Sequence, residues 1–232
     1  VEESIAAFVR RRLGREFLDY AIDPFVAGIY AGDPERISVA AAFPRLLALE
    51  QKYGSLIRGQ ILGARERRKN KEVAKNAAKS FSFRNGMQTL TDALAARLAH
   101  LACGVRVARV ARDGAAYVVE GTHGSERVVR RARSIVVAAP APAAAAIVAG
   151  IAPEAGRALG TIEYAPVAIV VCAYRRADVA HPLAGFGFLV PKVEHRAILG
   201  TLFSSSMFDG RAPGDRVLLT TFAGGRRNPE VL

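Results

Sequence analysis

The spacing of the apolar residues changes part-way along the chain, and this change limits the folds open to it. Up to about residue 101, apolar residues recur every three or four positions, as along one face of a helix. From Val105 onward, short runs alternate between apolar and polar residues or are apolar throughout, as in β-strands. Helices that come early and strands that come late, without an internal repeat, predict an α+β fold.

Capping residues and stop signals divide the first hundred residues into helices. The predicted helices are residues 4–22, 38–53, 55–62 and 90–101. Asp23-Pro24 is expected to close the first helix. The segment that follows, residues 25–34, is apolar and holds two glycines. It predicts either a buried turn between helices or a pocket wall where glycine lets the backbone approach a flat apolar ligand.

Strand patterns occupy most of the remaining chain. Strands are predicted at residues 81–83, 105–110, 116–121, 126–130, 134–140, 166–174, 186–190, 197–204 and 217–223. Residues 116–121 and 126–130 indicate a hairpin, whereas residues 134–140 are apolar and end at proline, as buried parallel strands do. A short alanine-rich helix is expected at residues 143–148.

Charge and cysteine content exclude some classes of protein. The net charge is +12, and residues 64–80 carry seven Lys or Arg against two Glu without one aromatic residue. Nucleic-acid binding modules combine such charge with aromatic stacking, so this stretch predicts a solvated segment and no nucleic-acid partner, while a membrane-surface role stays open. Two cysteines, Cys103 and Cys172, are too few for a disulfide framework or a zinc site, which fits a reducing compartment.

Targeting signals are not evident. The longest apolar run, residues 135–151, is broken by two prolines and a glycine and is shorter than the roughly 20 residues of a spanning helix. We therefore predict no transmembrane segment and no signal peptide, and a cytoplasmic protein for which a peripheral position on a membrane stays open. The chain starts at a helix start without Met and stops just after Asn228-Pro229-Glu230, so it is expected to be an internal fragment.

Familiar catalytic motifs are missing from the sequence. It contains no phosphate-binding glycine loop, no nucleophile elbow, no HExxH and no CxxC. The four histidines are scattered without metal-ligand spacing, and no pair of carboxylates stands out. We therefore predict no metal site and name no catalytic residue.

Several strings, in order, resemble the protoporphyrinogen oxidase family of FAD-dependent, amine-oxidase-like flavoproteins. They are DPFVAGIYAGDP at 23–34 with Ser38 and Phe43-Pro44, SFSF at 80–83 with GMQTL at 86–90, GFGFLVP at 185–191, LGTLFSS at 199–205 and TTFAGG at 220–225. The resemblance covers nearly the whole chain. It implies an enzyme that uses FAD and molecular oxygen to oxidise protoporphyrinogen IX to protoporphyrin IX in haem biosynthesis.

The same resemblance implies a domain organisation. It assigns residues 1–85 to a helical, membrane-facing region with the pocket loop, 86–160 to part of an FAD-binding α/β domain, and 161–232 to a mixed β-sheet of the substrate domain. The family's dinucleotide-binding motif, propionate-pairing arginine and C-terminal flavin motif lie outside this chain. We therefore expect the fragment alone to be inactive.

Site residues are carried over by position. Val107 corresponds to a valine whose backbone meets the adenine end of FAD. The residues that correspond to the substrate pocket are Phe25, Gly28 and Ala31 on the apolar segment, Phe186, Gly187 and Leu189 on one strand, and Leu202 and Phe222 on neighbouring strands. Leu189 and Phe222 are expected to grip a substrate ring from its two faces. Phe186 and Leu189 face opposite sides of a regular strand, so both reach the pocket only if Gly187 introduces a bulge.

Other functions stay open on the sequence alone. A related flavoenzyme oxidises coproporphyrinogen III to coproporphyrin III, a substrate that carries more carboxylates. A non-enzymatic basic module that binds a membrane or an apolar ligand is a third possibility, and a homodimer is a further open point.

Overall fold

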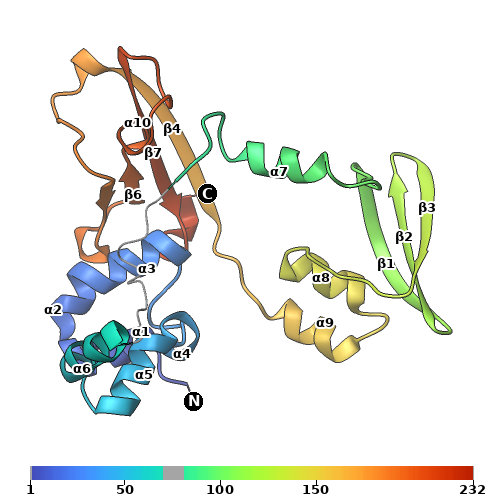
Figure 1. Cartoon of the computed structure of the whole chain (residues 1–232), viewed down its shortest axis with the longest axis horizontal. Helices are drawn as coiled ribbons and strands as arrows, with labels where there is room; N and C mark the ends of the chain where they lie inside the picture. Colours follow the sequence, from blue (N-terminus) through green and yellow to red (C-terminus); the bar gives the residue numbers. More distant parts are fainter. Residues whose placement is uncertain (1, 70–80, 232) are drawn as a thin grey trace. The chain divides into compact units, whose positions relative to one another are not determined.

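The computed structural model of the chain describes residues 2–69 and 81–231, which divide into two compact units. The first unit consists of residues 1–87 and 165–232, and the second of residues 88–164. The N-terminal helices therefore share a unit with the C-terminal sheet, although the two are far apart in sequence (Figure 1). The predicted α+β class is confirmed, with helices and two antiparallel sheets.

A helical path runs through the first 30 residues. Helix α1 (Ile5–Leu13) begins at Ser4, whose Oγ accepts the N–H of Ala7 at 3.1 Å, as the capping pattern predicted. It ends at Gly14, and α2 (Arg15–Phe17) and a π-helix (Leu18–Ile22) lead directly into α3 (Asp23–Tyr30).

The expectation that Asp23-Pro24 closes a helix is wrong. Pro24 lies in the first turn of α3, where the N–H that proline lacks has no intrahelical partner, so the helix tolerates it. The segment predicted as a turn is therefore mostly helical. It ends at Ala31, which takes a left-handed conformation with φ of 48°.

Three further helices complete the N-terminal region: α4 (Val39–Ala42), α5 (Pro44–Tyr53) and α6 (Leu56–Lys69). Ser38 caps α4, and Gly54 ends α5, as predicted. Pro44 interrupts the single helix expected here, because proline disfavours a helical conformation in the residue before it. The basic stretch from residue 70 to 80 lies outside the described residues. None of the helices within the described ranges is long and apolar enough to cross a membrane.

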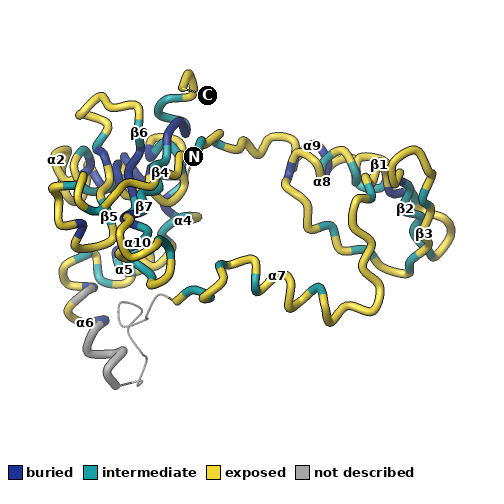
Figure 2. Tube along the Cα trace, turned by 90° about the horizontal axis from the view of Figure 1, so that it is seen from above, coloured by how far each residue is buried: buried dark blue, intermediate teal, exposed yellow. Residues whose placement is uncertain are grey.

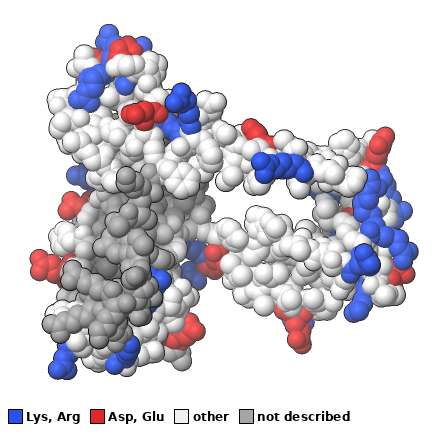
Figure 3. All heavy atoms as spheres, viewed as in Figure 1, with Lys and Arg blue, Asp and Glu red and all other residues white. Residues whose placement is uncertain are grey.

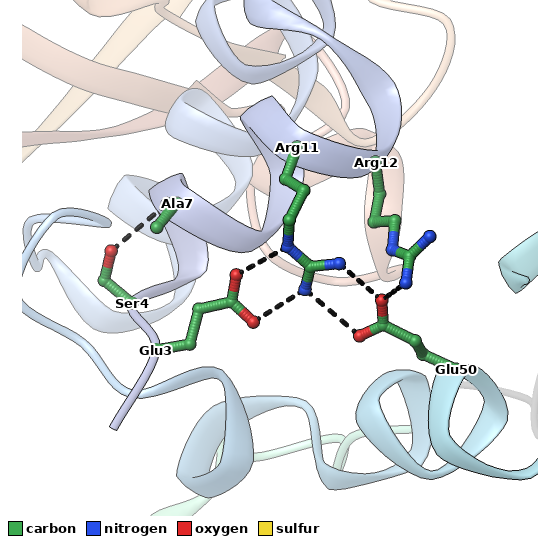
Figure 4. A network of polar contacts seen from close by, with 6 residues as sticks. All are labelled: Glu3, Ser4, Ala7, Arg11, Arg12 and Glu50. Carbon is green, nitrogen blue, oxygen red and sulfur yellow. Dashed lines mark hydrogen bonds and ion pairs between the residues drawn. The ribbon is translucent and has the colours of Figure 1, made fainter. Parts of the chain in front are cut away.

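A charged network stabilises the packing of α1 against α5 (Figure 4). The Arg11 guanidinium donates to the Glu3 carboxylate at 2.8 Å and to the Glu50 carboxylate at 2.6 Å, and Arg12 also pairs with Glu50. The hydrogen bond from Arg11 is the main cause that lowers the pKa of Glu50. Beside this network lies an apolar core that includes Ile5, Ala6, Phe8, Val9, Leu18, Val26 and Val39. Buried segments gather in this unit in Figure 2.

The C-terminal part of the first unit is a four-stranded antiparallel sheet in the order β4-β7-β6-β5. Its strands are β4 (Val167–Arg175), β5 (Gly187–Leu189), β6 (Ile198–Leu202) and β7 (Arg216–Gly224), so the four strands predicted here are confirmed. A short helix, α10 (Ser204–Met207), follows β6, and brief 3₁₀ turns lie at Arg176–Asp178, Lys192–Glu194 and Pro229–Val231.

The second unit holds a three-stranded meander and short helices. Its elements are α7 (Gln88–Ala95), β1 (Val105–Asp113), β2 (Ala116–His123), β3 (Glu126–Ala132), α8 (Ala141–Val148) and α9 (Pro153–Gly160). The hairpin and the alanine-rich helix are confirmed, whereas α9 was not predicted. Helix α7 begins two residues before the predicted residue 90 and ends well before residue 101.

Two predicted strands are wrong. Residues 134–140 pair with no described strand, and Val136 is 91% exposed. A buried parallel strand needs hydrogen-bonding neighbours, and a local apolar run cannot show whether they exist. Residues 81–83 are irregular instead, because the Arg211 side chain binds Ser82 Oγ and the Phe83 carbonyl oxygen and so fixes this segment from the side.

The charged network predicts a pH-dependent stability. Glu50→Gln should lower the free energy of unfolding by about 1–2 kcal/mol near neutral pH, because it removes a buried carboxylate that pairs with Arg12 and with Arg11, which keeps only Glu3. Since the pKa of folded Glu50 is lowered, its stabilisation is complete above its ordinary value of 4.5 and disappears as the pH falls through the folded value.

Urea unfolding of both proteins near neutral pH and near pH 3 measures this effect. Glu35→Gln, which removes an exposed ion pair with Arg10, is the control and should change the free energy by less than about 0.5 kcal/mol. An equal difference between Glu50→Gln and the unmodified protein at both pH values would contradict the account.

Candidate functional site

A row of residues paired across the four-stranded sheet forms one wall of the candidate site, called its floor below. The register of the four-stranded sheet places Leu189 opposite Gly200, Gly200 opposite Phe222, and Phe222 opposite Ile169. Residues paired in this way share a face of the sheet. Leu189 and Phe222 are therefore two strands apart, about 10 Å between their backbones, and Gly200 places no side chain between them.

Helix α3 packs over this row. It lies beside the sheet (Figure 1) and contacts β5 and β6. Its Gly28 lies directly against Leu189. A Cβ atom on Gly28 would be 2.6 Å from Leu189 Cδ2, and a Cβ on Gly200 would be 2.6 Å from the Phe188 carbonyl oxygen. At Gly200 the neighbour is backbone, so only glycine fits there, whereas a Cβ on Gly28 would displace the end of the Leu189 side chain. Leu189 Cδ2 would also be 3.1 Å from a Cβ on Gly200, so the Leu189 side chain lies between the two glycines.

A cavity of about 300 Å³ remains between α3 and the sheet. It is lined by Ala27, Gly28, Ile29, Ala31, Val167, Ile169, Phe188, Leu189, Leu199, Gly200, Thr201, Leu202 and Phe222. None of these side chains is charged. The only one with a polar atom is Thr201, whose hydroxyl is hydrogen-bonded to the Thr221 hydroxyl at 2.9 Å. The cavity is therefore suited to a flat, apolar group.

Five of the residues predicted for a substrate pocket line this cavity: Gly28, Ala31, Leu189, Leu202 and Phe222. The sequence did not single out Ile29, Ile169 or Leu199, which line it too. Ile29 belongs to the same apolar segment as Gly28, so the sequence alone could have indicated it as a lining residue. Ile169 comes from a distant strand, and only the register of the sheet brings it beside Phe222.

The other three predicted residues lie outside the cavity lining. Phe25 is on α3, and its ring stacks on Phe43 with ring centroids 6.2 Å apart. Phe186 precedes β5 and is 64% exposed. Gly187 has φ of 141°, and a Cβ there would be 2.0 Å from the Thr201 carbonyl oxygen, so it allows β5 to approach β6. The register of β5 has no bulge, and Leu189 reaches the cavity without Phe186.

Val107 lies in the other unit, in the middle of β1 opposite Gly121. The register shifts between Val107 and Arg109, which leaves Ala108 as the extra residue of a bulge. The Val107 side of the sheet has a hollow of about 660 Å³ whose lining includes Val105, Val107, Val119 and Gly121. This face is mostly apolar at its centre.

The charged residues of this sheet gather mainly on its opposite face. By alternation, Arg106, Arg109, Arg127 and Arg131 share that face with Glu120 and Asp113. Figure 3 shows Lys and Arg over the three-stranded sheet. Hydrogen bonding by Arg109 lowers the pKa of Glu120, and Arg131 pairs with Asp113 at 2.6 Å, so part of this positive charge is neutralised in place. Within residues 2–69 and 81–231, no group of His, Cys, Asp and Glu is arranged to hold a metal ion.

Comparison with known proteins identifies the family. The sequence profile of flavin-containing amine oxidoreductases matches residues 1–232. The chain belongs to this family. Family membership implies FAD as the cofactor. The fold is similar to that of a solved structure from Exiguobacterium sp. 255-15, with a TM-score of 0.75 and 23% identity over 97% of this chain and 46% of that one.

The curated relatives of this flavoprotein are named as oxidases of porphyrinogens. Mitochondrial protoporphyrinogen oxidase of Nicotiana tabacum is 36% identical over 99% of this chain and 50% of its own length. The chloroplastic enzyme of Oryza sativa subsp. japonica is 35% identical over 100% and 46%. Coproporphyrinogen III oxidase of Bacillus subtilis (strain 168) is 28% identical over 96% and 47%. The chain thus spans about half the length of the curated relatives it matches.

The described residues fit one part of FAD. The hollow beside Val107, next to a strand bulge, offers an apolar face and backbone groups to a flat ring such as adenine. A pyrophosphate needs N–H groups at a glycine-rich turn before a helix, and this sequence has no such motif. Among the described residues, those around Val107 therefore fit the adenine end of FAD.

The packing of Gly28 on Leu189 predicts a measurable coupling between the two positions. Gly28→Ala should displace the Leu189 side chain, a cost that Leu189→Ala removes. In a double-mutant cycle on thermal unfolding of the full-length protein, we expect a coupling of at least about 0.5 kcal/mol.

Gly32→Ala is the matched control for this cycle. Its Cβ would be 2.5 Å from Ile37 Cδ1, also the end of a flexible side chain, but Gly32 does not line the cavity. It should show no coupling to Leu189→Ala. Additive effects of Gly28→Ala and Leu189→Ala would show that α3 does not rest on Leu189.

Proposed function

We propose that the chain is part of an FAD-dependent oxidase of protoporphyrinogen IX, and that the cavity under α3 binds an apolar edge of this tetrapyrrole. The observation that carries the proposal is the uncharged cavity floor, where Leu189 and Phe222 flank Gly200, in a chain similar to proteins named protoporphyrinogen oxidase.

The shape of the cavity supports a tetrapyrrole edge rather than a whole ring system. A porphyrinogen is apolar over most of its surface and carries its carboxylates at the periphery. At about 300 Å³, the cavity is at the small end of the range for ligand pockets, which extends to about 1,000 Å³. It would therefore hold one part of the substrate by burial and ring packing, while the carboxylates point elsewhere.

The same cavity favours protoporphyrinogen over coproporphyrinogen. Coproporphyrinogen carries more carboxylates, and burying a carboxylate without a partner is costly. No lining side chain is cationic, and the nearby Arg227 guanidinium already pairs with Asp23. An extra carboxylate in this cavity would therefore have no counter-charge, which disfavours the larger acid.

The residues of this chain position the substrate and exclude water from it. Bound FAD supplies the hydride acceptor, with molecular oxygen as the final electron acceptor. Leu189 and Phe222 orient the ring, and α3 covers it from solvent. No side chain that lines the cavity is ionisable, so we assign no general base to it.

A peripheral position on a membrane is part of the proposal. Helix α6 exposes Ile57 and Ile61, four residues apart on one face, with side chains 71% and 56% exposed. Such residues suit contact with a lipid surface. Ile57→Ser with Ile61→Ser should lower binding to liposomes several-fold and leave turnover in detergent unchanged, and liposome binding equal to that of the unmodified protein would contradict this role.

The ring-gripping role of Phe222 predicts a kinetic effect in the full-length protein. Phe222→Ala removes an apolar contact of about 2–3 kcal/mol. The value of kcat/KM for protoporphyrinogen IX should then fall about 30- to 150-fold at roughly 1.4 kcal/mol per tenfold, with flavin content unchanged. Val107→Ala should change little, because the inferred contact with FAD is through the backbone.

Phe208→Ala is the aromatic control. Phe208 is also half-buried in the first unit, but it packs under the Arg211 guanidinium outside the cavity. It should leave kcat/KM near that of the unmodified enzyme. If Phe222→Ala costs several kcal/mol of stability and leaves kcat/KM of the folded enzyme intact, Phe222 is a core residue and the proposal is wrong there.

A further inference from the structure

A turn at the end of β7 binds both ends of α3. Gly224 and Gly225 have φ of 91° and 71°, so the chain reverses direction directly after the strand. The N–H of Arg226 then donates to the carbonyl oxygen of Ala31 at 2.8 Å, at the C-terminal end of α3. A Cβ on Gly225 would be 2.8 Å from that same oxygen, so only glycine allows this approach.

The neighbouring Arg227 reaches the other end of the helix. Its guanidinium donates to the Asp23 carboxylate at 2.6 Å and to the carbonyl oxygen of Val190 at 2.5 Å. The same carboxylate oxygen of Asp23 accepts the N–H of Lys192 at 2.9 Å. One arginine therefore joins the first turn of α3 to the chain that leaves β5.

The pair is buried, with side chains of Arg227 and Asp23 only 6% and 9% exposed. A buried ion pair adds little net stability over an apolar pair, but the loss of one partner leaves a costly unpaired charge. The loss of either side chain would therefore disfavour the present position of the first turn of α3. This favours a role in placing the helix over one in general stability.

We infer that Arg227 is a positioning residue for substrate, because it fixes the height of α3 above the floor of the cavity. The roof residue Gly28 lies on α3 between the two attachment points, and the roof residue Ala31, directly after the helix, carries one of them. Phe222, on the floor, lies on the same strand that carries the turn. The kinetic consequence rests on the proposed function, whereas the attachment itself does not.

The planar fork of arginine is required at this position. Two acceptors on different segments, a carboxylate and a carbonyl oxygen, are held by separate N–H groups of one guanidinium. Lysine would keep the charge but carry it on one nitrogen, so Arg227→Lys should retain the contact with Asp23 and weaken the one with Val190. Arg227→Lys should therefore change the exchange of α3 and KM less than a variant without the charge. It keeps the test informative if such a variant does not fold.

The test uses the full-length, flavin-loaded protein with Arg227→Met, Arg227→Lys and Asp23→Asn. Glu50→Gln is the control, since it also removes a carboxylate paired with arginine in the same unit but does not line the cavity. Amide hydrogen exchange of α3 and steady-state oxidation of protoporphyrinogen IX are measured. We expect exchange in α3 to rise about tenfold or more, KM to rise about tenfold, and kcat to change less than about twofold.

The two readouts separate failure of the inference from failure of the proposed function. Exchange in α3 of Arg227→Met that equals that of Glu50→Gln overturns the attachment, whatever the activity. Faster exchange with an unchanged KM in an active enzyme overturns the positioning role. If the unmodified protein does not oxidise the porphyrinogen, the proposed function fails, and with it the assignment of Arg227 to substrate, while the exchange data still decide the attachment.

Discussion

The close approach of α3 to the four-stranded sheet is the constraint on which the rest of the candidate site depends. Two glycines make it possible: Gly28 on the helix and Gly200 on the central strand β6 leave room for the Leu189 side chain between them. Gly200 also adds no side chain of its own between the backbones of Leu189 and Phe222. The cavity is therefore produced by missing side chains within tightly packed secondary structure, and its shape depends on backbone positions rather than on a mobile loop.

The described side chains that line this cavity carry no charge. With a net charge of +12, a cation in the lining would be unremarkable, yet the lining has none. The buried Arg227 is committed to Asp23 and Val190. In the second unit, Arg109 and Arg131 pair with Glu120 and Asp113 on the face of the sheet away from Val107. Under the proposed function, burying a carboxylate in this cavity without a counter-charge from the described residues would be costly, which would disfavour the more acidic substrate.

Local patterns predicted the elements well where the structure itself is local. The strands of the four-stranded sheet and the caps at Ser4 and Ser38 follow from nearest-neighbour chemistry. Helix α3 was missed because Asp23-Pro24 is a stop signal inside a helix but a good start signal in a first turn. Ile169 joined the site only through strand register, and residues 134–140 lack the partners a buried strand needs. Both depend on contacts distant in sequence, which a single sequence does not show.

The central claim is that a porphyrinogen lies between Leu189 and Phe222, under α3. A crystal structure of the full-length protein with FAD and protoporphyrin IX bound tests it most directly, because the product keeps the four pyrrole rings and the peripheral substituents of the proposed substrate. The account predicts one edge of the macrocycle in the cavity, with Leu189 and Phe222 in contact with opposite faces of a pyrrole ring and its carboxylates outside the lining. A porphyrin bound elsewhere, with no part of it in the cavity beside Leu189, would contradict the account.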